Sequence, residues 1–92
     1  MLFMVIERFK NQNAAAIYKR FTEKGRMLPE GLNYLDSWVE ANYDRCFQLM
    51  SCDDAKLLQQ WVVQWHDLVE FEFIPVVPSK HAWESFGKSA KP

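Results

Sequence analysis

The sequence predicts an α+β domain of the ferredoxin-like βαββαβ plan, with a four-stranded antiparallel sheet that carries two helices on one face. A length of 92 residues supports one hydrophobic core, and 49% apolar residues with 15% aromatics exceed what a disordered chain contains. Along the chain the apolar spacing alternates between strand and helix periods in the order strand, helix, strand, strand, helix, strand. We therefore expect one ferredoxin-like domain over residues 1–78, followed by a short helix and a flexible tail over residues 79–92.

The first half of the chain predicts a central strand and a capped helix. Residues 2–9 are rich in β-formers and apolar on both alternations until Glu7, which is typical of a strand covered on both faces. Which of its faces meets the helices is left open. Asn11 or Asn13 can cap the helix that follows, and Gly25 suits its C-terminal end. The apolar stripe of this helix consists of Ala14, Ile17, Tyr18 and Phe21.

The second half of the chain predicts a hairpin, a second helix and a fourth strand. Residues 32–42 and 45–52 each alternate in character, and a turn-prone segment joins them. Asp53 and Asp54 suit the N-terminal end of the second helix, where carboxylates meet free backbone N–H groups. Residues 68–77 return to alternation. The stripe of the second helix consists of Leu57, Leu58, Trp61, Val62 and Trp65, and we interpret its tryptophans as core.

The two faces of the predicted sheet differ in character. We assign to the helix side the apolar alternation of the outer strands: Leu35, Val39, Phe47, Leu49, Val69, Phe71 and Phe73. The opposite, open face would present Tyr34, Asp36, Trp38, Glu40, Gln48, Met50, Glu70, Glu72 and Ile74. Nothing else in the chain covers this partly apolar face, and such patches mark interfaces. We therefore expect two copies to pack sheet against sheet as a dimeric α/β barrel.

The candidate ligand-binding residues are the large and acidic side chains of this open face. They are Tyr34, Asp36, Trp38, Glu40, Gln48, Met50, Glu70 and Glu72. Trp38 is the strongest candidate for a ligand contact, because its indole N–H needs a polar partner there. Carboxylates desolvated in a dimer can act as general bases, although alternating acids on a strand usually form a solvated face. No catalytic residue is assigned.

Charge, cysteines and histidines exclude several function classes. A net charge of −1 with interspersed signs does not attract nucleic acid, and no apolar run approaches the roughly 20 residues of a membrane helix. No leader pattern is seen, so we expect a cytoplasmic location. Cys46 and Cys52 fit reduced core positions, while His66 and His81 lack further donors, so no metal or cofactor is expected. A solvated helix surface explains the basic cluster of Lys19, Arg20, Lys24 and Arg26.

Several segments together carry a family resemblance. They are Met4-Val5, Leu28-Pro29-Glu30-Gly31, Trp38, and the run from Trp65 through Asp67-Leu68 and Phe71-Glu72 to Pro75-Val76. In these segments the chain resembles the uncharacterised bacterial family catalogued as domain of unknown function 3303, from the first strand to about Pro78. The resemblance implies the dimeric α/β-barrel superfamily, which includes cofactor-independent monooxygenases, haem-degrading enzymes, chlorite dismutase-like proteins and ligand-binding regulators.

Three functions are compatible with these observations. The first is a small homodimeric domain that binds a small organic ligand in the cleft on the open sheet face. The second is a cofactor-independent monooxygenase or isomerase-like enzyme of the dimeric α/β-barrel type, and the third is a purely structural oligomerisation domain. Binding or assembly is favoured over catalysis, because the sequence shows no activated nucleophile, metal cluster or phosphate-binding loop.

Overall fold

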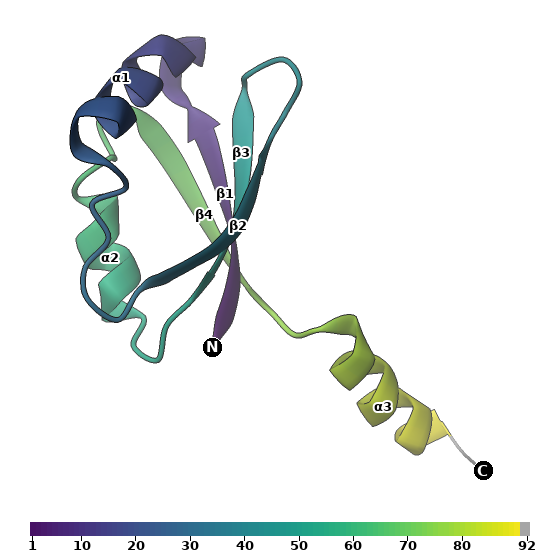
Figure 1. The fold of residues 1–92 in the computed structure, drawn as a ribbon. Helices are drawn as coiled ribbons and strands as arrows, with labels where there is room; N and C mark the ends of the chain where they lie inside the picture. The colour runs from purple at the N-terminus through teal and green to yellow at the C-terminus, as the bar shows by residue number, and fades with distance from the viewer. Residues whose placement is uncertain (91–92) are drawn as a thin grey trace.

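The computed structural model describes residues 1–90, with the side chains of residues 1–87. Its elements are β1 (Leu2–Phe9), a 3-10 turn η1 (Lys10–Gln12), α1 (Ala14–Lys24), β2 (Asn33–Val39), β3 (Arg45–Ser51), α2 (Lys56–Val62), β4 (Val69–Val76) and α3 (Ser79–Ala90). The four strands form one antiparallel sheet in the order β2-β3-β1-β4, and α1 and α2 cover one face of it (Figure 1). The predicted α+β class, antiparallel sheet and helix layer are confirmed.

Strand β1 lies at the centre of the sheet, paired with β3 on one side and β4 on the other. Phe3, Val5 and Phe9 are buried on the helix side, so the odd-numbered residues of β1 meet the helices. This settles the question that the sequence left open. Because side chains alternate along a strand, Glu7 lies on the same side as these three core residues.

The prediction for β3 assigned its two faces the wrong way round. Cys46, Gln48 and Met50 are buried on the helix side, whereas Phe47 and Leu49 lie on the open face. Both alternations of β3 contain large or apolar side chains, so its own sequence gives no clear inward face. Pairing decides the matter, because directly opposite residues of antiparallel strands share a face and Gln48 lies opposite the fully buried Val5 of β1.

A β-bulge in β2 overturns part of the prediction for that strand. The register with β3 shifts between Tyr34 and Asp36, so that Leu35 is the additional residue. Tyr34 pairs with Met50 on the helix side, and Leu35 is exposed, opposite to both assignments made from the sequence. Asp36 lies on the open face, as predicted. The extra residue shifts the inward and outward alternation of β2 by one position. A prediction that assumes an uninterrupted period of two misses this shift.

Apart from Glu40, the remaining strand assignments agree with the sequence. Trp38 pairs with Phe47 on the open face, and Val39 pairs with Cys46 on the helix side. In β4, Phe71 packs on Trp61 of α2. Strand β2 ends at Val39, three residues before its predicted end, so Glu40 lies in the turn rather than in the sheet.

The helix ends follow the predicted capping chemistry. The Asn13 side chain accepts a hydrogen bond from the Ala16 N–H at 3.2 Å, and Gly25 ends α1 with a φ of 69°. The Asp54 carboxylate accepts a hydrogen bond from the Lys56 N–H at 2.9 Å at the start of α2. These contacts confirm Asn13 and Gly25 as caps. Helix α2 itself begins at Lys56, slightly later than expected.

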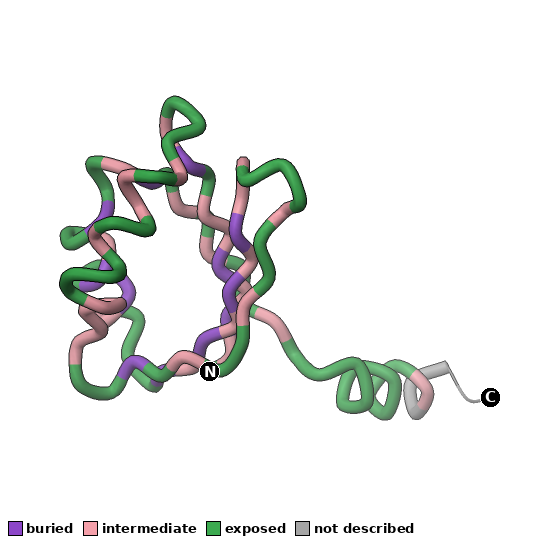
Figure 2. The backbone as a smooth tube through the Cα atoms, turned by 45° about the horizontal axis from the view of Figure 1, so that its top comes forward, coloured by how far each residue is buried: buried purple, intermediate pink, exposed green. Residues whose placement is uncertain are grey.

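The core lies between the sheet and the helix layer, as Figure 2 shows by the buried segments that face each other. Trp61 and Trp65 are buried there, as predicted, and so are Cys46 and Cys52, which are free thiols. The core cluster is formed by Phe3, Val5, Leu32, Met50, Cys52, Leu58, Trp61, Trp65 and Val69.

Helix α3 extends away from the body of the domain (Figure 1). Its Trp83 and Phe86 residues are 75% and 77% exposed, so the described part of the chain covers little of either. The helix continues to Ala90, further than the short helix expected from the sequence. The end of the predicted flexible tail, residues 91–92, lies outside the described residues.

Candidate functional site

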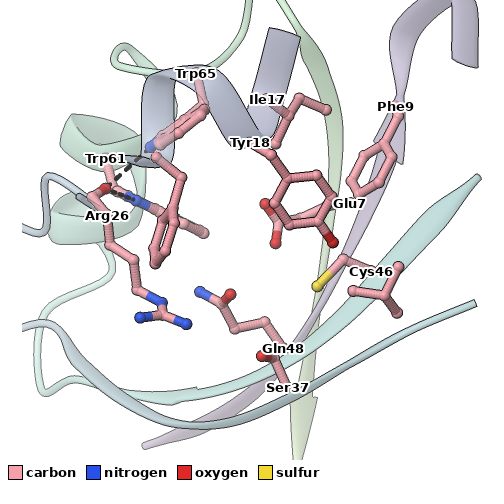
Figure 3. Close-up of a pocket in the computed structure, with 12 residues that line it drawn as sticks. Glu7, Phe9, Ile17, Tyr18, Arg26, Ser37, Cys46, Gln48, Trp61 and Trp65 are labelled. Atoms are coloured by element: carbon pink, nitrogen blue, oxygen red, sulfur yellow. Dashed lines mark hydrogen bonds between the residues drawn. The ribbon is translucent and has the colours of Figure 1, made fainter. Parts of the chain in front are cut away.

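A pocket of about 140 Å³ lies between the sheet and the helix layer (Figure 3). We call it the interlayer pocket. It is lined by Glu7, Phe9, Ile17, Tyr18, Phe21, Arg26, Ser37, Val39, Cys46, Gln48, Trp61 and Trp65. Aromatic walls with a few convergent polar groups are the usual composition of a small-molecule site.

Glu7 places a carboxyl group inside this pocket. Burial raises its pKa from 4.5 to about 7, although the nearby Cys46 thiol and Arg26 guanidinium oppose this rise. The cost of removing a carboxylate from water favours the neutral form. At neutral pH Glu7 therefore exists in both protonation states, and it can donate or accept a proton.

Cys46 and Tyr18 surround the Glu7 carboxyl (Figure 3). Burial and the neighbouring carboxyl raise the pKa of the Cys46 thiol to about 12. Burial also raises the pKa of Tyr18, and Cys46, Tyr43 and Glu7 add to this effect. Both groups are therefore protonated at neutral pH. Cys46 consequently offers a weak hydrogen-bond donor and not a thiolate nucleophile.

Arg26 enters the pocket from the loop after α1. Its backbone carbonyl accepts hydrogen bonds from the indole N–H groups of Trp61 and Trp65, both at 3.0 Å (Figure 3). Its guanidinium lies 3.6 Å from the ring centre of Tyr34 and 5.0 Å from that of Phe21. Among the described residues no carboxylate lies within ion-pair distance of this guanidinium. The loop thus holds a positive charge against aromatic rings, and this charge acts on Glu7 without a direct ion pair.

Two neutral polar side chains come from the sheet. The Gln48 amide donates a hydrogen bond to the Met50 sulfur at 3.3 Å, which is a weak acceptor. The Ser37 hydroxyl and the Tyr34 hydroxyl lie 2.7 Å apart. The pocket therefore combines an acid, a cation, an amide and hydroxyl groups with aromatic walls, and it can both orient a ligand and exchange a proton with it.

The eight residues proposed from the sequence do not gather on one face. Asp36, Trp38, Glu70 and Glu72 lie on the open face of the sheet, as expected. Tyr34, Gln48 and Met50 lie on the helix side, because of the bulge in β2 and the register of β3. Of the eight, Gln48 alone lines the interlayer pocket.

Glu40, the eighth of these residues, forms a two-pronged ion pair with Arg45. Both Glu40 oxygens accept hydrogen bonds from the Arg45 guanidinium at 2.8 Å. These bonds lower the pKa of Glu40 below its usual value. Glu40 is therefore an ionised partner of Arg45, which is poorly suited to act as a general base.

The open face carries a second, polar depression of about 180 Å³. It is lined by Ile6, Arg8, Glu70, Phe71 and Glu72. Two of the proposed ligand-binding residues, Glu70 and Glu72, lie at its edge. Their role in ligand binding stays a prediction.

Sequence reasoning missed three residues of the interlayer pocket as functional groups: Glu7, Arg26 and Cys46. Glu7 had a usable signal, since it lies two residues from Val5 and from Phe9 on a strongly apolar strand. Such a position predicts a buried carboxyl. Arg26 was placed with a solvated basic cluster, which is wrong for this residue because its guanidinium lies in the pocket. Cys46 was correctly placed in the core, but its contact with Glu7 depends on strand pairing.

In the part of the chain that the structure describes, no three or more His, Cys, Asp or Glu side chains are grouped so that they could hold a metal ion. No helix among the described residues has the length and apolar character needed to cross a bilayer.

The chain belongs to the family described as domain of unknown function (DUF3303), whose model matches residues 1–90. The family resemblance seen in the sequence is thereby confirmed. No curated protein and no solved structure matches the chain. The family description names no activity.

Proposed function

We propose that this member of the DUF3303 family is a homodimeric domain that binds a small organic ligand in the interlayer pocket. The observation that supports this most strongly is the placement of Glu7 and Arg26 in one aromatic-lined cavity of about 140 Å³. A partly buried carboxyl and a guanidinium without an ion-pair partner among the described residues both cost stability, so a functional role is a reason for the fold to keep them. Titratable groups with perturbed pKa values in a cleft are typical of functional sites.

A pair of substitutions on β2 tests the location of the ligand. Val39→Phe adds bulk to a residue that lines the pocket, whereas Leu35→Phe adds the same ring at the exposed bulge. We expect fragments that raise the melting temperature of the wild type to lose this effect in Val39→Phe and to keep it in Leu35→Phe. Equal losses in both variants, or equal retention, would contradict a site in the interlayer pocket.

The protonation behaviour of Glu7 favours an isomerase-like enzyme as a second candidate function. A general base works best when its pKa lies near the working pH, and burial raises the pKa of Glu7 to about 7. Glu7 would remove a proton from carbon beside a carbonyl group of the ligand and return it at a neighbouring atom. A cofactor-independent monooxygenase of the dimeric α/β-barrel type would begin with the same proton removal.

Glu7→Gln separates this enzyme from a pure binding protein. Glutamine preserves the size and hydrogen bonding of the side chain but cannot accept the proton. If the domain is an enzyme, we expect the variant to bind the ligand yet lose deuterium exchange from solvent into it. Exchange at the wild-type rate would rule out Glu7 as the base.

We further propose that the strand order β2-β3-β1-β4 is the ferredoxin-like arrangement of the dimeric α/β-barrel superfamily. The open face supports this proposal, because Ile6 and Phe47 lie beside each other at its centre and Trp38, at the edge, is 53% exposed. The face also contains both Arg8 and Glu72, so a twofold axis can bring opposite charges together. A second copy is the partner that suits such a self-complementary face.

The dimer offers a second location for a ligand, in the cleft between the two facing sheets. Asp36, Trp38, Glu70 and Glu72 would line that cleft. If the two faces pack without a gap, the open face acts as a structural oligomerisation surface. The ligand then binds in the interlayer pocket and not between the sheets.

Light scattering after size-exclusion chromatography tests the dimer. We expect twice the chain mass for the wild type and a single chain mass for Trp38→Arg, which puts a charge on the open face. Trp83→Arg on α3 is the matched control, because its tryptophan is also exposed, at 75%, but lies outside the sheet. A monomeric wild type would rule out sheet-to-sheet association.

A further inference from the structure

We infer that the interlayer pocket selects small aromatic carboxylic acids, with the ligand carboxylate on the Arg26 guanidinium and the ring against the tryptophan and phenylalanine walls. This inference rests on the proposed function, because it names the ligand class of the same pocket.

The volume and the walls of the pocket fix the size and shape of the ligand. An apolar cavity of about 150 Å³ holds one benzene molecule. The interlayer pocket, at about 140 Å³, therefore has room for one six-membered ring with a short substituent. Phe9, Phe21, Trp61 and Trp65 supply aromatic surface from three directions, namely β1, α1 and the α2 region. Flat ring faces stack on such walls more favourably than a branched alkyl group does.

The unpaired Arg26 guanidinium fixes the charge of the ligand. The rings of Phe21 and Tyr34 hold this group in place, and the indole bonds from Trp61 and Trp65 hold its backbone. Because the guanidinium is planar and already positioned, it can donate two parallel hydrogen bonds to a carboxylate at little entropic cost. The three other arginines, Arg8, Arg20 and Arg45, each pair with a carboxylate. None of them lines the pocket.

Glu7 gives this binding a pH dependence. The charged or titratable groups that face its carboxyl are Tyr18 from α1, Arg26 from the loop and Cys46 from β3, and Phe71 lies opposite it on β4. Tyr18 and Cys46 keep their protons at neutral pH, so Glu7 is the group that changes charge there. A protonated Glu7 leaves the pocket with one positive charge. An ionised Glu7 competes with the ligand carboxylate for Arg26, so binding weakens as the pH rises through 7.

The test uses sodium benzoate and its neutral counterpart benzamide as probes of the full-length chain, observed by ¹H–¹⁵N NMR. The indole N–H signals of Trp61 and Trp65 report on the pocket directly, since both groups bind the Arg26 carbonyl. At pH 6 we expect benzoate to bind roughly tenfold more tightly than benzamide, the difference of one charge-assisted hydrogen bond.

Arginine variants test the role of Arg26, with Arg8 as the control position. Arg26→Gln should remove the preference for benzoate, and Arg8→Gln, the same change on the open face, should keep it. Arg26→Lys preserves the charge if the glutamine variant does not fold. Between pH 6 and pH 8 the benzoate affinity of the wild type should fall severalfold, whereas that of Glu7→Gln should stay level.

Three results would overturn the inference. If benzamide binds as tightly as benzoate with shifts at both indoles, the pocket binds ligands but does not select carboxylates, and the proposed function survives alone. If neither probe shifts the indoles at millimolar concentration, both proposals fail for single-ring ligands. If the benzoate shifts centre on Arg8 and Arg45, the carboxylate binds to the open face and the assignment to Arg26 is wrong.

Discussion

The two faces of the sheet differ in how far their polar side chains are buried and in what surrounds them. On the helix side, polar side chains are partly or fully buried, and Glu7 keeps a carboxyl where its ionised form is disfavoured. On the open face, carboxylates and arginines stand beside apolar side chains, and Glu72 lies in the row of Ile6 and Phe47. The pattern on the helix side is typical of a binding pocket. The pattern on the open face is typical of a protein–protein interface. The same strands thus carry two surfaces of different chemical character.

Removing a tryptophan from each face should give the largest difference between them. Trp61 is 2% exposed, and its indole N–H binds the Arg26 carbonyl at 3.0 Å. We expect Trp61→Ala to lower the free energy of unfolding by about 3–5 kcal/mol, because it leaves a cavity and removes one of the two indole hydrogen bonds to the Arg26 carbonyl. Urea denaturation at a fixed protein concentration measures this loss.

Trp38→Ala is the matched variant on the open face, where the side chain is 53% exposed. At concentrations at which the chain is monomeric, we expect a change of less than about 0.5 kcal/mol. A loss as large as that of Trp61→Ala would show that the open face contributes to the core, and it would remove the distinction between the two faces.

The pH dependence of stability tests the buried carboxyl on the helix side. The pKa of Glu7 is higher in the folded state, so its protonated form contributes stability that is fully present below pH 4.5 and is lost as the pH rises to about 7. A rise of this size corresponds to about 3 kcal/mol between pH 4 and pH 8. We expect urea titrations of the wild type to show this fall and those of Glu7→Gln to show a much flatter profile.

The same substitution on the open face, Glu70→Gln, is the control, and it should keep the fall seen in the wild type because Glu7 is still present. If Glu7→Gln and the wild type lose stability in parallel between pH 4 and pH 8, the carboxyl of Glu7 is ionised in the folded protein and the assignment of an acid in the pocket is wrong.

The smallest effect is expected at the surface ion pair between Arg20 of α1 and Asp67. Their two hydrogen bonds measure 2.7 and 2.6 Å, and they lower the pKa of Asp67 to about 2. This contribution is present above pH 3.8 and is lost as the pH falls toward 2, below the window of Glu7. Asp67→Asn should therefore shift the urea midpoint slightly at pH 6 and still less at pH 2.

High salt offers a second check on this ion pair. Exposed pairs are screened at high ionic strength. We expect the difference between the wild type and Asp67→Asn at pH 6 to shrink in molar salt, whereas the pH profile due to Glu7 changes little because that group is buried. A midpoint shift that is equally large in low and high salt would show that Asp67 acts through packing instead.

Part of this structure could be predicted from the sequence, because the signals are local. The strand and helix periods, the caps at Asn13 and Gly25 and the core tryptophans depend on neighbours within a few residues, and the structure confirms them. The candidate site could be predicted only in fragments. Gln48 was named, but on the wrong face, and Glu7 and Arg26 were not named at all.

The sequence by itself determined the element order, the single core, the reduced cysteines and the family. Only the tertiary structure decided which face of β3 turns inward, where β2 carries its bulge, and that the loop after α1 brings Arg26 to Glu7. The physical reason is that strand alternation has a period of two and assigns a face only where one alternation is clearly more apolar. In β3 both alternations are large or apolar, so pairing with a fully buried neighbour sets the face, and that same pairing builds the pocket.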